Sequence, residues 1–114
     1  MTIKDLTRCA QLKLVQEDFD DAVITGGYTS DLLSDVMAHA AADNVLITIQ
    51  AHINTIAVAK LVGIRALIIA NDREILEDMA QAAKKERIAI FCSTLNQFDL
   101  SVLIGQLLAK DHAR

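Results

Sequence analysis

Three polar side chains follow a predominantly apolar segment near the middle of the chain. Gln50, His52 and Asn54 alternate along the sequence directly after residues 45–49. If the backbone stays extended there, alternation places the three side chains on one side. Buried polar groups without hydrogen-bond partners are costly, so these side chains require a ligand, a second subunit or aspartates of the same chain.

A pair of carboxylates lies upstream at helical spacing. Asp31 and Asp35 are four residues apart, so a helix would place them on one face. Such a pair can hold Mg²⁺ or act as acid and base, although Asp31 is also the first-turn acid that a helix dipole favours. Asp35 with His52 would form an acid–base dyad. Neither Ser34 nor another nucleophile can be placed beside that dyad from the sequence.

A glycine turn is a further candidate site. Thr25, Gly26 and Gly27 precede Ser30, which we expect to cap the following helix. Glycines let backbone N–H groups approach an oxyanion, and the helix dipole adds attraction. An ordinary capped tight turn explains the same residues. The pattern lacks the lysine of a phosphate-binding loop, so we do not expect transfer of phosphate from ATP.

One arginine follows a predicted strand. Arg73 comes shortly after the apolar segment 66–70. A guanidinium group can bind phosphate or carboxylate through paired hydrogen bonds. The alternative is an ion pair with Glu74 or Glu77 on its own helix, which contributes little stability when exposed.

The hydrophobic pattern predicts the elements that position these residues. Short apolar segments alternate with helical segments, which indicates βαβ units and one three-layer α/β domain, with a mainly parallel central sheet and helices on both faces. The predicted strands are 12–15, 22–25, 45–49, 66–70 and 88–91. The predicted helices are 2–12, 31–41, 55–62, 73–87 and 97–108. Their expected caps include Thr2, Ser30, Asn54 and Asp72.

The topology predicts where the candidate residues meet. Ligands of open α/β sheets bind at the carboxyl ends of the parallel strands. Strands 22–25 and 45–49 are joined by a single helix, so a right-handed crossover would make them parallel neighbours. We therefore expect residues 50–54 to face the glycine turn at one edge of the sheet.

Composition limits the class of protein. The 114 residues, 53% of them hydrophobic, suffice for one domain, with a lead-in at 1–21, a core at 22–108 and a frayed tail at 109–114. The net charge of −4 argues against nucleic-acid or membrane partners, which need a basic face. The first residues lack the apolar region of a signal peptide, and Cys9 and Cys92 form no metal-binding pair. We expect a cytoplasmic protein without metal or cofactor.

Several motifs together resemble the DRTGG domain family. The resemblance covers about residues 23–108, and its most specific parts are Gly26–Gly27, Asp31–Met37, Thr48–Asn54 and Ala57–Ala59. Related domains occur in bacterial HPr kinase/phosphorylase, in some phosphotransacetylases and beside CBS domains in regulatory pyrophosphatases. The resemblance implies an α/β regulatory module that self-associates. The chain departs from the family at residues 70–73, which lack the glycines of the naming pentapeptide.

Two functions of different classes follow. The first is a non-catalytic regulatory module that self-associates and binds a small anionic ligand such as an adenine nucleotide. The second is an accessory subunit that contacts a metabolic or redox enzyme, for example a hydrogenase-linked one, without a small ligand. A small enzyme using Asp35 and His52 is a third interpretation. Helix 31–41 and residues 53–62 carry more apolar surface than one sheet face can bury, which predicts a homodimer.

Overall fold

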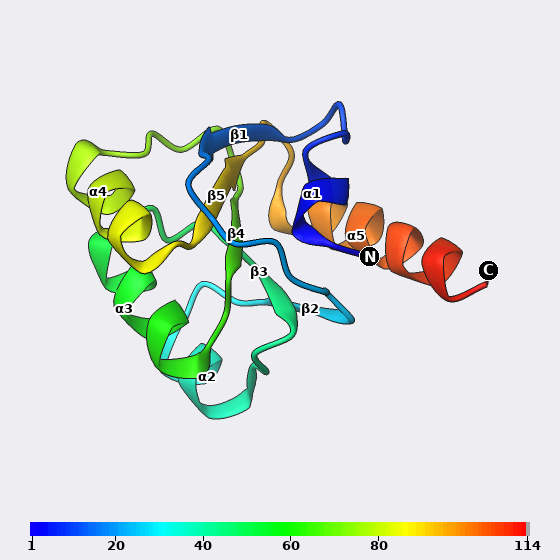
Figure 1. The fold of residues 1–114 in the computed structure, drawn as a ribbon, viewed down its shortest axis with the longest axis horizontal. Helices are drawn as coiled ribbons and strands as arrows, with labels where there is room; N and C mark the ends of the chain where they lie inside the picture. The colour runs from blue at the N-terminus through cyan, green and yellow to red at the C-terminus, as the bar shows by residue number, and fades with distance from the viewer. Residues whose placement is uncertain (114) are drawn as a thin grey trace.

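A five-stranded β-sheet runs through the computed structural model, which describes residues 1–113 (Figure 1). The strands are β1 (Lys13–Gln16), β2 (Gly26–Thr29), β3 (Asn44–Thr48), β4 (Ala66–Ile69) and β5 (Ala89–Cys92). Their order in the sheet is β1-β5-β4-β3-β2. β1 is antiparallel to β5, and the other neighbouring pairs are parallel. The predicted mainly parallel α/β sheet is therefore confirmed.

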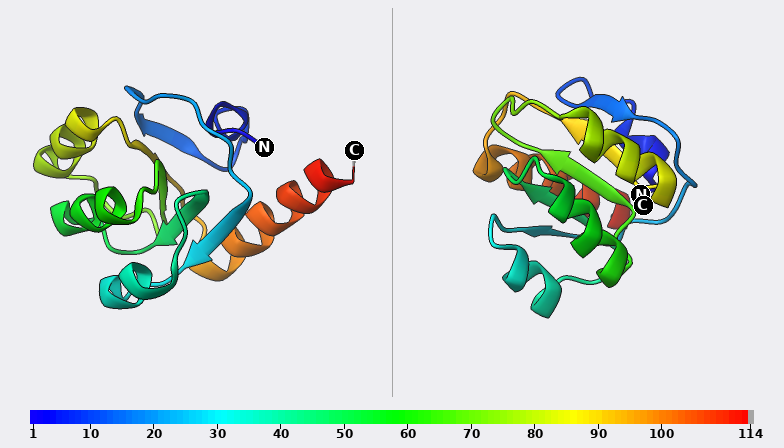
Figure 2. Two further views of the ribbon diagram at one scale, coloured as in Figure 1. Left: turned by 60° about the horizontal axis from the view of Figure 1, so that its bottom comes forward. Right: turned by 90° about the vertical axis from the view of Figure 1, so that its left-hand side faces the viewer.

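Helices cover both faces of this sheet. The crossovers α2 (Leu33–His39), α3 (Ile53–Val62) and α4 (Glu77–Glu86) lie together on one side in Figure 2. The chain steps in order from β2 to β5, so successive right-handed crossovers fall on the same face. α1 (Ile3–Leu6) and α5 (Gln97–His112) cover the opposite face and complete the three layers.

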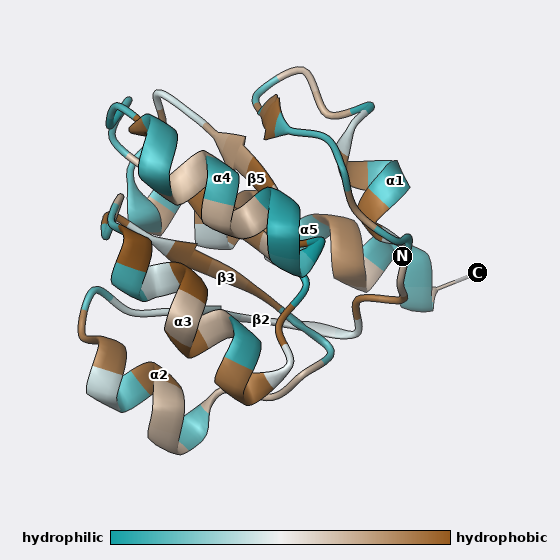
Figure 3. Ribbon diagram, turned by 60° about the vertical axis from the view of Figure 1, so that its left-hand side comes forward, coloured by the Kyte–Doolittle hydropathy of each residue, from teal (hydrophilic) through white to brown (hydrophobic). Residues whose placement is uncertain are grey.

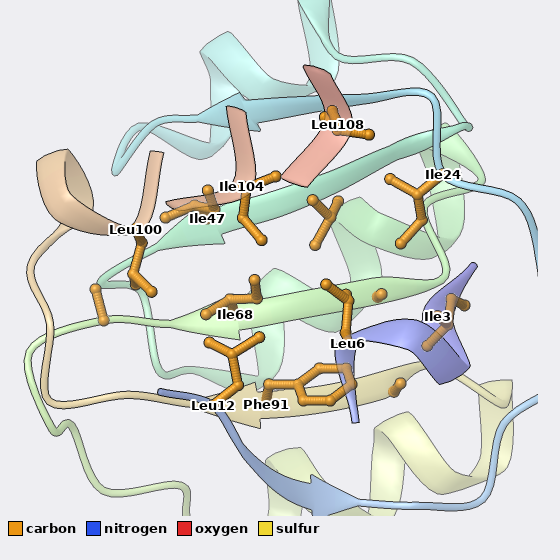
Figure 4. Close-up of a cluster of buried hydrophobic side chains, with 14 residues drawn as sticks. Ile3, Leu6, Leu12, Ile24, Ile47, Ile68, Phe91, Leu100, Ile104 and Leu108 are labelled. Atoms are coloured by element: carbon orange, nitrogen blue, oxygen red, sulfur yellow. The ribbon is translucent and has the colours of Figure 1, made fainter. Parts of the chain in front are cut away.

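Each face of the sheet has its own hydrophobic core, because successive residues of a strand point to opposite faces. Figure 3 shows the hydrophobic ribbon of β3 and β5 between the helices. The core beneath α1 and α5 includes Ile3, Leu6, Leu12, Ile24, Ile47, Ile68, Phe91, Leu100, Ile104 and Leu108 (Figure 4). The core beneath the crossover helices includes Val36, Leu46, Ile56, Ala59, Leu67, Met79, Ala83 and Ile90.

The two chain ends meet on the α1–α5 face. The ammonium group of Met1 donates a hydrogen bond of 2.5 Å to Asp111 Oδ2 in the last turn of α5. The helix α5 continues past the expected end at Leu108, so residues 109–112 are helical rather than a frayed tail. Residue 114 of that expected tail lies outside the described residues. Within residues 1–113, no helix is long and apolar enough to cross a membrane.

The glycine pair lies in a strand instead of a turn. The predicted strand 22–25 is wrong, because β2 begins at Gly26, which pairs with Asn44 at the amino end of β3. A Cβ atom on Gly26 would lie 3.0 Å from Asn44 Nδ2, so glycine permits this close approach. Residues 22–25 have the greater local strand propensity, but pairing with β3 outweighs it and determines where the strand lies.

The helix before β5 starts later than predicted. α4 begins at Glu77, with Leu76 as its N-cap, and Asp72 does not cap it. Asn71 and Asp72 adopt left-handed backbone, with φ of 64° and 53°, which separates β4 from the helix. α1 is also shorter than predicted and ends at Leu6, although the cap at Thr2 is confirmed.

Candidate functional site

The carboxyl ends of β2, β3, β4 and β5 lie at one edge of the sheet, because these four strands are parallel. Helices α2 to α5 begin at the same edge. We call the loops between these strands and helices, residues 30–32, 49–52, 70–76 and 93–96, the carboxyl edge. Five of the eleven predicted site residues lie there: Ser30, Asp31, Gln50, His52 and Arg73.

Gln50 joins the first two loops of the carboxyl edge. Its Nε2 donates a hydrogen bond of 2.8 Å to the backbone oxygen of Asp31. Its own backbone is fixed by two buried threonines: its N–H donates to Thr48 Oγ1, and its carbonyl accepts from Thr55 Oγ1 at 2.7 Å. Gln50 therefore lies beside the loop before α2.

His52 is the N-cap of α3. Its Nδ1 accepts the backbone N–H of Asn54 at 3.0 Å, so the proton of the neutral ring is on Nε2. The cap predicted at Asn54 is wrong, because the helix already begins at Ile53. The exposed Asn54 amide has no hydrogen-bond partner within the described residues. The start of α3 therefore presents an imidazole N–H and an amide group to solvent.

Asp35 has other partners than the predicted one. Its carboxylate accepts a hydrogen bond of 2.8 Å from the Tyr28 hydroxyl and lies 3.1 Å from His39 Nδ1. The Tyr28 bond, with smaller contributions from Ser30 and His39, holds the pKa of Asp35 below its ordinary value. The same bond raises the pKa of Tyr28. Among the described residues no hydrogen bond joins Asp35 to His52, so the predicted acid–base dyad is not formed.

This cluster predicts a pH-dependent loss of stability. We expect Tyr28→Phe to destabilise the protein at neutral pH and to have a smaller effect in acid. The folded pKa of Asp35 is lowered, so its stabilising contribution is present above about pH 4 and is lost as pH falls through the folded pKa. Urea unfolding of both proteins across this range measures the difference, and a difference that does not change with pH would contradict the assignment.

The glycine segment lies away from the carboxyl edge. Thr25, Gly26 and Gly27 are at the amino end of β2, where Thr25 Oγ1 donates to Asp43 Oδ2. The predicted anion cradle beside His52 is therefore wrong. Pairing with β3 places the glycines at the amino ends of the parallel strands, away from the carboxyl edge where His52 lies.

The helix α2 is not capped by Ser30 as predicted. Its N-cap is Leu32, and Ser30 Oγ accepts the backbone N–H of Leu32 at 3.1 Å before the helix begins. Ser34 is exposed in the first turn, and within residues 1–113 neither its side chain nor that of Asp31 forms a hydrogen bond. Ser30 and Asp31 thus lie at the carboxyl edge, whereas Ser34 belongs to the surface of α2.

A hollow of about 260 Å³ opens at the other end of the carboxyl edge. Its lining residues are Ala10, Gln11, Leu12, Lys13, Asp72, Cys92, Ser93 and Thr94. Sequence reasoning missed Lys13, because it belongs to the antiparallel strand β1, whose first residue pairs with the last residue of β5. Arg73 is exposed in the adjacent loop. Within residues 1–113 it forms no ion pair with Glu74 or Glu77.

Comparison with models of protein families and with curated proteins finds no match to either. Within residues 1–113, no group of three or more His, Cys, Asp and Glu side chains is placed to hold a metal ion.

Proposed function

We propose that the chain is a non-catalytic regulatory module similar to DRTGG domains, which self-associates and binds a small anionic ligand such as an adenine nucleotide. The observation that carries the ligand proposal is the start of α3. There, at the positive end of a ten-residue helix, neither the His52 Nε2–H nor the Asn54 amide forms a hydrogen bond to any of residues 1–113. Gln50 holds this segment in place through its bond to Asp31.

The neighbouring loop supplies the positive charge that such a ligand requires. β3 and β4 are adjacent strands, so the loop after β4, which contains Arg73, follows the loop that contains His52 along the carboxyl edge. The backbone N–H groups of Asn71 and Asp72 hold this loop to the loop after β5. The carboxyl edge also carries Asp31, Asp72 and Glu74, which disfavour an isolated phosphate ion. A nucleotide, with both an anionic group and a polar ring, would use the arginine, the imidazole and the amide together.

A thermal-shift measurement tests the ligand proposal. We expect ATP, ADP or AMP to raise the melting temperature of the wild-type protein, because a ligand of the native state stabilises it by mass action. His52→Asn should abolish this shift without lowering the melting temperature of the free protein. Asparagine is among the best N-caps, so the variant keeps a cap while losing Nε2.

A second histidine provides the matched control. His39→Gln changes an exposed histidine that bonds Asp35 on α2, so the ligand-induced shift should persist in this variant. Absence of a shift with every nucleotide and with inorganic phosphate would contradict the ligand proposal. An unchanged shift in His52→Asn would place the site elsewhere, with Arg73 as the next residue to substitute.

A protein partner is the second candidate function. Leu32, Ile53 and Leu76 are exposed at the starts of α2, α3 and α4, all at the carboxyl edge. Exposed large apolar groups beside unoccupied hydrogen-bonding groups are typical of a protein interface. An accessory subunit would give no thermal shift with small metabolites, so the same experiment separates the two functions.

A further inference from the structure

The two edges of the sheet differ in how they are protected. β1 carries Lys13 and an irregular register between Leu14 and Gln16, and both features discourage pairing with another strand. β2, with the sequence Gly-Gly-Tyr-Thr, contains no charged residue, no proline and no bulge. The β2 edge is therefore open to the addition of a strand.

Part of the β2 backbone points away from the sheet at this edge, because β2 is the last strand in the order of the described sheet. The N–H of Ser30 donates to Ile47 on the β3 side, at 3.2 Å. Alternation along the strand then directs the backbone groups of Tyr28 to β3 and those of Gly27 and Thr29 away from the sheet. Gly27 and Thr29 are exposed, as this arrangement requires.

The helix α5 provides an apolar surface beside the same edge. Thr29 Oγ1 and Ser101 Oγ lie 2.6 Å apart, which places α5 against β2. Phe98 is 74% exposed and Val102 44% exposed, and their spacing places them on one helix face. A hollow of about 130 Å³ between strand and helix is lined by Gly27, Thr29, Ile47, Ser101, Ile104, Gly105 and Leu108.

We propose that β2 pairs antiparallel with β2 of a second copy of this chain, across a two-fold axis at Tyr28. This register places Gly27 opposite Thr29 of the second copy, so the outward backbone groups can form about four hydrogen bonds. The side chain of Thr29 from the second copy then lies beside Gly27, which has no side chain of its own. The two Tyr28 residues form a cross-strand pair on the opposite face.

Charge and area favour a second copy over a foreign peptide. α5 carries Asp99 in its first turn and Lys110 in its last turn. In the proposed dimer the two α5 helices run antiparallel, so the acidic end of each helix faces the basic end of the other. A stable interface buries about 800 Å² on each partner, more than one short strand supplies. A second copy also covers Phe98 and Val102, whereas a single peptide strand at β2 would leave them exposed.

Light scattering after size-exclusion chromatography, at about 50 µM protein, tests this inference. The wild-type protein should have the mass of two chains. Gly105→Glu should have the mass of one chain and remain folded by circular dichroism. A Cβ atom at Gly105 would meet no atom within 4 Å in the folded chain, and Gly105 is exposed, so the site has room for a larger residue. Ala57→Glu, the same kind of change on the exposed side of α3, should remain a dimer.

A second variant tests the strand pairing itself. Thr29→Pro removes an outward N–H while leaving the hydrogen bonds to β3 intact, so it should weaken the dimer by at least about 10-fold. A wild-type mass of one chain, or a dimer that survives both variants, would overturn the inference. The inference rests on the proposed self-association and not on ligand binding, so a nucleotide-induced thermal shift in Gly105→Glu still tests the latter.

Discussion

Phe91→Ala is expected to lower the free energy of unfolding by about 3–5 kcal/mol. Phe91 lies at the centre of β5 and is 0% exposed, packed in the core beneath α1 and α5 (Figure 4). Its removal leaves a cavity between the sheet and α1 that the surrounding strand residues cannot fill. The native state of a domain this size is stable by only about 5–15 kcal/mol, so the loss is a large fraction of the total.

Urea unfolding measures this effect against an exposed control. Leu61→Ala removes a large apolar side chain that is 71% exposed on α3, so its cost should be below about 0.5 kcal/mol. Similar losses for the two variants would show that the core does not contain Phe91 as described.

Gly63→Val is expected to cost about 2–3 kcal/mol, from left-handed backbone and crowding together. Gly63 ends α3 with φ of 94°, a conformation that β-branched residues rarely adopt. A Cβ atom there would also lie 3.1 Å from the Cβ of Ala42. The end of α3 would therefore be strained in two ways by the same substitution.

Gly63→Asn separates the two causes. Asparagine tolerates left-handed backbone better than valine, so Gly63→Asn should cost less than Gly63→Val. Chemical unfolding of both variants measures the difference. Equal costs would assign the effect to the contact with Ala42 instead of the backbone conformation.

The buried strands were predictable because their sequences are apolar on both faces. Segments 45–49, 66–70 and 88–91 correspond to β3, β4 and β5 within one or two residues at each end. β2 was not predictable, since Gly26 and Gly27 have low strand propensity and their place is decided by pairing with β3.

The candidate site was partly predictable for similar reasons. Alternation after β3 identified Gln50 and His52, and Gln50 does reach the loop before α2. The partner of Asp35 depended on β2, because Tyr28 faces the start of α2 only in the observed register. The cap role of His52 depended on the first residue of α3, and sequence patterns fix helix ends only within a few residues.

The contact between Met1 and Asp111 has a consequence for how the domain can be combined with others. Entry and exit of the chain lie at the same place, on the face that α1 and α5 cover. A host protein could therefore carry this domain within one of its surface loops, because the two ends of that loop would not be forced apart. The carboxyl edge would remain outside such a junction, because it does not include the chain ends.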